Sequence, residues 1–227
     1  MKKIICLILC VSVIASIFCV AIAAQPSSGK VYCRNIAKEK KVALTFDDGP
    51  HPRYTKEILD ILKEYGVTAT FFIIGVNAEN YPESLKLIID SGCEIGNHTY
   101  SHTRIDKMSD KELEAEILKC QQVLYTMTGI KTRHFRPPQG RVSNDLLSVT
   151  ERLGYNVILW SIDTLDWSHN PTDNICAAVK NSLTDGDIIL MHDYISGKNT
   201  TCDALRIIIP DLLSKGYAFV TISELLE

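Results

Sequence analysis

The chain has 227 residues, of which 46% are hydrophobic and 22% charged, and its formal net charge is −3. It contains no block of like charges and no basic stripe, which argues against nucleic acid as a partner. Beyond an apolar N-terminal stretch roughly 200 residues remain, enough for one domain with a closed core.

The N-terminus predicts export. Met1-Lys2-Lys3 precedes an apolar run from Ile4 to Ala24. A positive start, a long apolar stretch and small residues at its end are typical of a secretory signal peptide, expected here at residues 1–24. An uncleaved membrane anchor at residues 4–24 is the alternative, because the run is long enough to cross a bilayer. We therefore expect a secreted or cell-surface protein whose only association with a membrane is through this segment.

Beyond the leader, residues 25–38 are expected to be a short linker and residues 39–227 one domain. Short apolar runs predict seven strands, at 42–46, 69–74, 94–97, 132–136, 156–161, 187–191 and 218–221. Helical patterns separate most of them: Ser109 and Glu112 form a capping box before one helix, and Asn170-Pro171 opens another. Seven such alternations predict a parallel α/β barrel, closed or incomplete, which we expect to be a monomer.

Two adjacent acids, Asp47 and Asp48, end the first predicted strand of the domain, and Gly49-Pro50 turns the chain behind them. The carboxyl ends of parallel strands are where ligands and catalytic groups gather in α/β folds. Two like charges in a cleft repel each other unless a cation neutralises them. The pair therefore predicts a metal, an arginine or both, with an ordinary turn and a loop acid as the alternative.

A pair of histidines supplies candidate partners. His98 and His102 are four residues apart and follow the strand-like run 94–97. Two imidazoles and one carboxylate make a three-ligand site with an open position, which is the catalytic pattern for zinc and its neighbours. The spacing alone is weak, because loop histidines also fall four residues apart.

Five motifs in order resemble the polysaccharide deacetylases of the NodB-homology type, carbohydrate esterase family 4. They are 45–50 (TFDDGP), 98–102 (HTYSH), 136–140 (RPPQG), 163–167 (DTLDW) and 190–192 (LMH). The resemblance covers nearly all of the chain after the leader and implies a distorted (β/α)7 barrel with the motifs on its C-terminal rim. One departure is Gln139, whose place is often aromatic in the family.

The resemblance implies a role for each motif residue. Asp48, His98 and His102 would hold one divalent metal, zinc first, with cobalt, manganese or nickel as alternatives. Asp47 would take a proton from the attacking water, and Arg136 would hold Asp47 in position. The backbone N–H of Gln139 would face the oxyanion, and Trp167 and Leu190 would form apolar walls around the acetyl methyl.

His192 follows the apolar run 187–191 and resembles the family's general acid. A carboxylate beside the imidazole would orient it and raise its pKa. Asp166 is preferred for this task because the family's Asp-Trp pair falls on Asp166-Trp167, and Asp163 is the competing residue. The other histidines, His51, His134 and His169, are expected on the surface or in loops, with His51 near the substrate.

The predicted function is metal-dependent removal of N-acetyl groups from a cell-wall glycan, with N-acetylglucosamine of peptidoglycan as the first candidate. A chitooligosaccharide deacetylase, an N-acetylmuramic acid deacetylase and an acetylxylan esterase remain alternatives, because substrate choice lies in rim loops. A second class is a silent glycan-binding protein that has kept the barrel. No G-x-S-x-G elbow occurs, which argues against a serine esterase.

Overall fold

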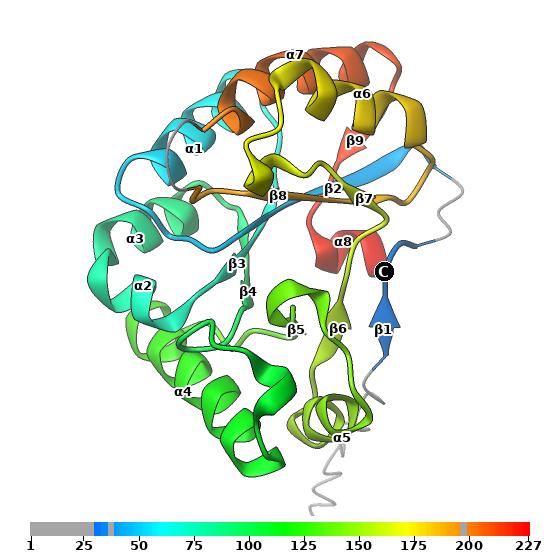
Figure 1. Cartoon of the computed structure of the whole chain (residues 1–227). Helices are drawn as coiled ribbons and strands as arrows, with labels where there is room; N and C mark the ends of the chain where they lie inside the picture. The colour runs from blue at the N-terminus through cyan, green and yellow to red at the C-terminus, as the bar shows by residue number, and fades with distance from the viewer. Residues whose placement is uncertain (1–29, 36–38, 196–198) are drawn as a thin grey trace, which may run out of the picture.

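The computed structural model describes residues 30–35, 39–195 and 199–227. The strands in these ranges (Figure 1) are β1 Val31–Tyr32, β2 Lys41–Asp47, β3 Thr70–Ile73, β4 Glu94–Asn97, β5 His134–Phe135, β6 Asn156–Ile158, β7 Ile162–Asp163, β8 Ile188–His192 and β9 Ala218–Phe219. The α-helices are α1 Tyr54–Tyr65, α2 Gly75–Asn80, α3 Pro82–Asp90, α4 Asp110–Thr128, α5 Asn144–Leu153, α6 Thr172–Ser182, α7 Thr201–Ser214 and α8 Ile222–Leu226. Three short 3-10 helices are η1 Ile105–Lys107, η2 Pro138–Gly140 and η3 Asp166–Ser168.

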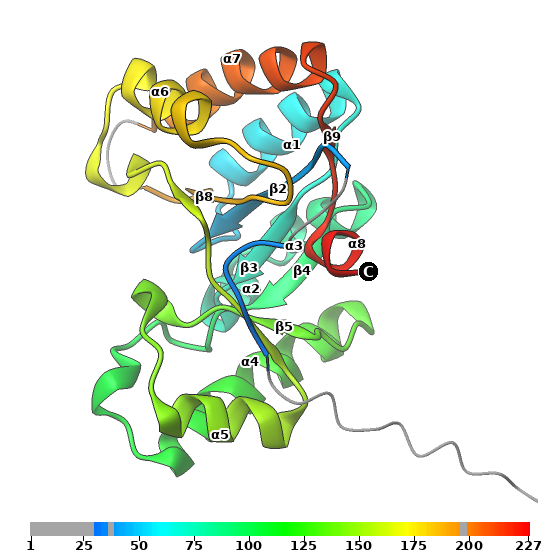
Figure 2. The ribbon, with the colours of Figure 1, turned by 90° about the vertical axis from the view of Figure 1, so that its right-hand side faces the viewer.

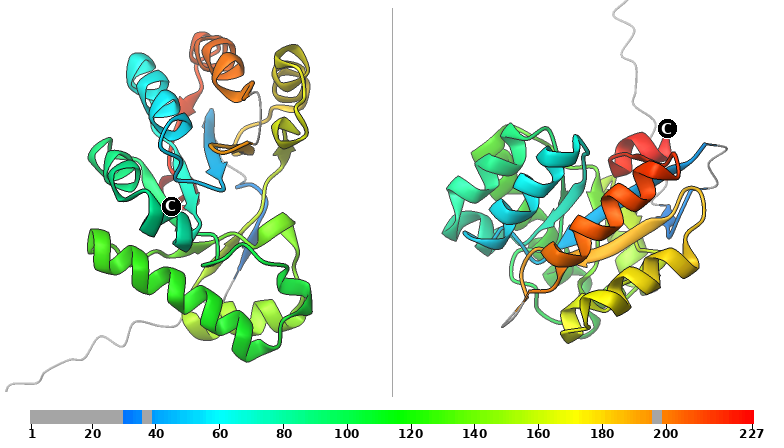
Figure 3. Two further views of the ribbon diagram at one scale, coloured as in Figure 1. Left: turned by 60° about the vertical axis from the view of Figure 1, so that its left-hand side comes forward. Right: turned by 90° about the horizontal axis from the view of Figure 1, so that it is seen from above.

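The strands form one curled sheet with most helices outside it. Their order is β1-β6-β5-β4-β3-β2-β8-β7, and β9 pairs with β2 beside this path. Neighbouring strands run parallel throughout. Helices α1, α6 and α7 lie together on one side and α4 and α5 on the other, with the strands between them (Figures 2 and 3). Since β1 and β7 end the order of the described strands, the barrel is incomplete, and the predicted distorted barrel is confirmed.

Alternation along β2 separates the outer core from the barrel interior. Val42, Leu44 and Phe46 belong to the large core beneath the outer helices. Ala43, between them, belongs to a second cluster, as expected for a strand whose side chains point to opposite faces. The same period carries Asp47 toward the interior. The residue that follows, Asp48, lies beyond the strand and has a left-handed backbone with φ of 76°.

Helix α8 covers the end of the barrel at which the strands begin. Its Ile222 and Leu225 pack with Ala43, Ile158 and Ile188 and are 0% and 2% exposed. Thr221 caps the helix through a capping box with Glu224. The apolar plug leaves the opposite, C-terminal end of the strands as the open mouth.

Helix boundaries follow the sequence signals closely. The capping box of Ser109 and Glu112 is present at the start of α4, which confirms that prediction. Helix α6 begins directly after Pro171. Gly66 and Gly129 cap α1 and α4 in the left-handed conformation, which costs glycine little.

Two predictions about particular segments are corrected. The sequence does not predict β1, which pairs with β6 through Val31 and Val157 and so brings part of the expected linker 25–38 to the sheet edge. A strand of two residues shows no alternation to detect. His134 is no surface or loop residue: it lies on β5, is 4% exposed and places Nε2 2.9 Å from Ser223 Oγ.

The predicted signal or anchor, residues 1–24, lies outside the described residues. Among those described, no helix is long and apolar enough to cross a membrane. The cysteines there, Cys33, Cys93, Cys120, Cys176 and Cys202, are all free.

Candidate active site

Strand register brings the predicted residues to one end of the barrel. Asp47 at the end of β2 is aligned with His192 at the end of β8. Asn97 at the end of β4 is aligned with Phe135 on β5, so the next residues, His98 and Arg136, leave neighbouring strands together. Parallel pairing therefore gathers four motifs at the same mouth.

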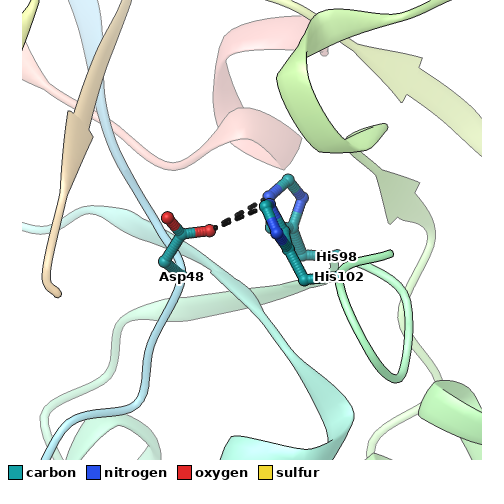
Figure 4. A group of neighbouring side chains, drawn as sticks. All are labelled: Asp48, His98 and His102. Carbon is teal, nitrogen blue, oxygen red and sulfur yellow. Dashed lines mark ion pairs between the residues drawn. The ribbon is translucent and has the colours of Figure 1, made fainter. Parts of the chain in front are cut away.

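Asp48, His98 and His102 form a compact cluster with one ligand atom from each residue (Figure 4). These ligand atoms all lie within 4.8 Å of one another. Asp48 Oδ1 is 3.5 Å from His98 Nε2 and 3.2 Å from His102 Nε2. His102 has a left-handed backbone with φ of 54°. Such a carboxylate and two imidazoles suit a divalent transition metal.

Two observations show that the cluster fits a cation. Asp48 Oδ1 is buried and makes no hydrogen bond in the described structure, although buried carboxylate oxygens normally have partners. His98 Nδ1 lies 2.7 Å from the Arg136 carbonyl oxygen. When Nδ1 donates its proton to that carbonyl, Nε2 keeps its lone pair and faces the cluster, as metal-binding histidines require.

The electrostatics of the cluster point the same way. Burial acts to raise the pKa of Asp48, but the histidines, His98 foremost, outweigh it and lower the pKa to about 2. Burial likewise acts to lower the pKa of His98, but the charges of Asp47 and Asp48 raise it. The two carboxylates thus favour positive charge at this point, which a metal can supply in place of a proton.

Asp47 contacts an arginine, as expected for an oriented base. Arg136 is 0% exposed, and its Nη1 donates to Asp47 Oδ1 at 2.7 Å and to Thr45 Oγ1 at 2.8 Å. Its remaining nitrogens donate to the carbonyl oxygens of Ile158 and Leu159. Burial lowers the pKa of Arg136, and Asp47 opposes that effect. The other oxygen, Asp47 Oδ2, faces the cluster of Asp48, His98 and His102 and lies 3.7 Å from His98 Nε2.

His192 is paired with Asp166 rather than with Asp163. His192 Nδ1 lies 2.8 Å from Asp166 Oδ1, and the His192 backbone N–H donates to Asp166 Oδ2. Thr201 also donates to that carboxylate. Burial acts to lower the pKa of His192, but the hydrogen bond and charge of Asp166 outweigh it and raise the pKa to about 9. Asp163 instead accepts from the Leu165 N–H.

One cavity of about 450 Å³ is lined by Asp47, Asp48, His98, His102, Asp163 and His192, whereas Arg136 and Asp166 lie behind its wall. Gln139, Trp167 and Leu190 line it too, where the sequence expects the substrate to bind. Gln139 has a left-handed backbone with φ of 60°, and its side-chain oxygen accepts from Arg141. Leu190 is 3% exposed, whereas Trp167 is 54% exposed. A wall formed by these two residues would therefore be buried on one side and open to solvent on the other.

Two residues that shape the site are not among those predicted from the sequence. Trp160 lines the cavity, and a Cβ on Gly140 would lie 2.7 Å from its ring. The signal in the sequence was the position of Trp160 near the end of the predicted strand 156–161. Asp193 packs against Gly49, where a Cβ would lie 2.0 Å from its Oδ2. Burial raises the pKa of Asp193 to about 7, and Thr55 donates to it at 2.5 Å.

A curled parallel sheet with a carboxylate–histidine cluster at its C-terminal mouth defines a (β/α)-barrel enzyme. Residues 34–158 match the family model described as polysaccharide deacetylase. A peptidoglycan-N-acetylglucosamine deacetylase of Bacillus cereus is 39% identical over 191 residues, which are 83% of this chain and 89% of that protein. The chain therefore belongs to the polysaccharide deacetylase family.

Solved structures give the same result. The Bc1960 peptidoglycan N-acetylglucosamine deacetylase, in complex with 4-naphthalen-1-yl-N-oxidanyl-benzamide, superposes with a TM-score of 0.84 and 36% identity, covering 87% of this chain and 92% of that one. A second structure, BA3943 of Bacillus anthracis, is a family pseudoenzyme with a TM-score of 0.82 and 31% identity, over 88% of this chain and 70% of that one. The fold alone therefore does not separate active members from inactive ones.

Proposed function

We propose that this enzyme removes the acetyl group from N-acetylglucosamine residues of peptidoglycan. The observation that carries the reaction is the placement of an oriented carboxylate, Asp47, and an oriented imidazole, His192, on adjacent strands beside a three-ligand cluster. The substrate rests on similarity to proteins named for peptidoglycan N-acetylglucosamine, at 39% identity over most of the chain.

The residues divide the hydrolysis of the amide between them. Asp47 takes a proton from water as the water oxygen bonds to the acetyl carbon. His192, protonated, donates a proton to the sugar nitrogen as the carbon–nitrogen bond breaks, which releases acetate and a free amine. The Gln139 N–H is assigned to the developing oxyanion, and Leu190 and Trp167 to the acetyl methyl.

A divalent metal held by Asp48, His98 and His102 would polarise the acetyl carbonyl and make the attacking water more acidic. We assign zinc to this site, because one carboxylate and two imidazoles form the usual catalytic zinc set. Cobalt, manganese and nickel suit the same ligands.

Metal content gives a direct test of this assignment. Elemental analysis of protein purified without chelator is expected to find about one zinc per wild-type chain and a large loss in a His98→Ala, His102→Ala variant. His169→Ala, which changes an exposed histidine, is the matched control. Wild type with no more metal than the double variant would refute the site, and another metal at full occupancy would refute zinc.

Acetate release tests class and substrate together. Metal-loaded protein, chelated protein and chelated protein given zinc again would be incubated with peptidoglycan, chitooligosaccharides and acetylxylan. We expect zinc-dependent release that is fastest on peptidoglycan, with glucosamine as the new sugar. Faster release of acetate from another glycan would assign that glycan, instead of peptidoglycan, as the substrate. No release from any of them would favour the silent glycan-binding function; one similar structure, BA3943, is a family pseudoenzyme.

We further propose that the enzyme works outside the cytoplasm, on the cell wall. The support is the apolar leader of residues 4–24 after two lysines, since peptidoglycan is reached only after export.

A further inference from the structure

A group of aromatic rings lies beside the catalytic mouth, and no step of the reaction uses it. His51 stacks on Tyr54 and on Tyr194, each with ring centroids 4.9 Å apart, at interplanar angles of 22° and 17°. The Tyr81 ring is tilted against His51 at 6.2 Å. We call His51, Tyr81 and Tyr194 the aromatic platform.

The central ring of the platform is held in one orientation. His51 Nδ1 accepts the backbone N–H groups of Arg53 and Tyr54, each at 3.2 Å, at the start of α1. The backbone N–H of His51 in turn donates to Thr55 Oγ1 at 2.7 Å. Burial, with the charge of Arg53, lowers the pKa of His51, which favours the neutral ring. Because Nδ1 is an acceptor, Nε2 carries the ring proton and can donate it to a ligand.

The platform is continuous with the catalytic residues along the chain. His51 is three residues after Asp48, and Tyr194 is two residues after His192. Their Cα atoms therefore lie within about 11 Å and about 8 Å of those residues. Asn77 links the two regions, since its Nδ2 donates to the Asp48 carbonyl oxygen at 2.8 Å. Asn77 and Pro50 also line a small cavity of about 170 Å³ together with the platform.

The outer rings of the platform are accessible. Tyr81 is 36% and Tyr194 43% exposed, although large aromatic rings are usually more deeply buried. An exposed cluster of aromatic rings with a few polar groups is typical of a binding surface. Among the described residues, the platform also offers ordered polar atoms, the Asn77 amide and His51 Nε2, beside these rings.

We propose that the aromatic platform is a sugar subsite that binds the pyranose ring next to the one being deacetylated. The inference rests on the proposed function, since it takes the substrate to be a glycan chain. Aromatic faces attract the weakly positive C–H groups of a pyranose ring, and the amide and imidazole can bond its hydroxyl or acetamido groups. The platform therefore favours chains over single sugars.

The test compares substrates of increasing length. kcat and KM for acetate release would be measured on N-acetylglucosamine oligomers of two to six units and on an aryl acetate, which has no sugar. Tyr194→Ala and Tyr81→Ala remove platform rings, and Tyr194→Phe keeps a ring. Tyr125→Ala is the matched control, because Tyr125 on α4 is 54% exposed and outside the platform. Thermal melting would verify that each variant is folded.

We expect the alanine variants to raise KM for the longer oligomers about five- to tenfold, the usual effect of one lost aromatic contact. This increase in KM should grow with oligomer length and be smallest on the aryl acetate. Tyr194→Phe should keep a KM close to that of the wild type. Losses that are equal for dimer, hexamer and aryl acetate would overturn the proposal, and so would losses no larger than those of Tyr125→Ala.

Calorimetric titration with the hexamer separates this inference from the proposed function. If the wild type released no acetate, the deacetylase function would fail, but hexamer affinity would still be measurable. Binding weakened by Tyr194→Ala and not by Tyr125→Ala would support the platform. Hexamer affinity within twofold of the wild type in both tyrosine-to-alanine platform variants would refute it.

Discussion

Two neighbouring residues of one type receive opposite environments at the mouth of this barrel. Asp47 ends β2 and faces Arg136, which fixes one of its oxygens at 2.7 Å. Asp48 has a left-handed backbone and faces two histidines instead. The difference arises from one step along a strand and one change of φ. The roles proposed for them, base for Asp47 and metal ligand for Asp48, can therefore be tested separately by substitution.

Asp47→Asn tests the base. The amide nearly preserves the shape but cannot accept the proton of water, so we expect kcat to fall by about two or more orders of magnitude. The metal content should stay at the wild-type level. Asp48→Asn is the matched comparison and should lose metal. If Asp47→Asn lost the metal while Asp48→Asn kept it, the two roles would be exchanged.

The pH dependence of kcat/KM tests the acid. In the proposed mechanism, catalysis requires ionised Asp47 and protonated His192, so a bell-shaped profile is expected. Because Asp166 helps raise the pKa of His192 to about 9, the protonated form persists above neutral pH and is lost as pH rises through that value. Asp166→Asn removes the charge, lowers the pKa and should move the basic limb down by roughly one to three pH units.

The aryl acetate distinguishes His192 from other titrating groups. Its leaving group departs without needing much protonation, so His192→Ala should slow amide hydrolysis far more than ester hydrolysis. Equal losses on both substrates, with the basic limb intact, would assign that limb to a different group.

At the residue scale, the sequence predicts the type of reaction better than it predicts the individual side-chain contacts. The motifs indicate which carboxylates and imidazoles meet, because their types and spacing limit the possible reactions. Whether Asp163 or Asp166 meets His192 depends on the turn at η3, where Leu165 has a left-handed backbone with φ of 55°. A leucine in the sequence does not predict such a conformation. Trp160 was missed because a tryptophan after a strand is equally typical of a core.

At the scale of elements, α8 stabilises the barrel by packing against the end at which the strands begin. Its Ile222 is 0% exposed and packs inside the sheet. Ile222→Ala should lower the free energy of unfolding by about 2–5 kcal/mol, because the plug cannot collapse around the lost atoms. Ile207→Ala on α7, where the side chain is 41% exposed, is the control and should cost far less. Equal losses in urea denaturation would contradict the plug.

Elements with strong periodicity were predictable, and edge strands were not. β2 and β8 carry apolar runs buried on both faces, and β4 is buried apart from Glu94. The predicted ranges of these three strands differ from the structure by at most one residue at either end. By contrast, β1 and β7 have two residues each and are defined by their partners β6 and β8. Such strands depend on pairing with a sheet that is already formed, so local sequence carries little signal for them.

At the scale of the whole molecule, export is the open prediction. Expression of the full chain in a secreting host should give protein outside the cytoplasm, shortened by about 24 residues if the signal is cleaved. Intact mass of the extracellular protein would measure this. Full-length protein in the membrane fraction would instead indicate the anchor, and protein retained in the cytoplasm would contradict both.

The alignment of β2 with β8 also determines which changes of chain length the enzyme can tolerate. Since side chains alternate, deleting one residue within β2 would turn Asp47 away from the interior and put its neighbour in its place. The same deletion in an exposed loop, such as the turn after α4, would leave every strand where it is. A library of single-codon deletions should therefore lose activity abruptly along β2 and β8, and gradually or not at all elsewhere on the surface.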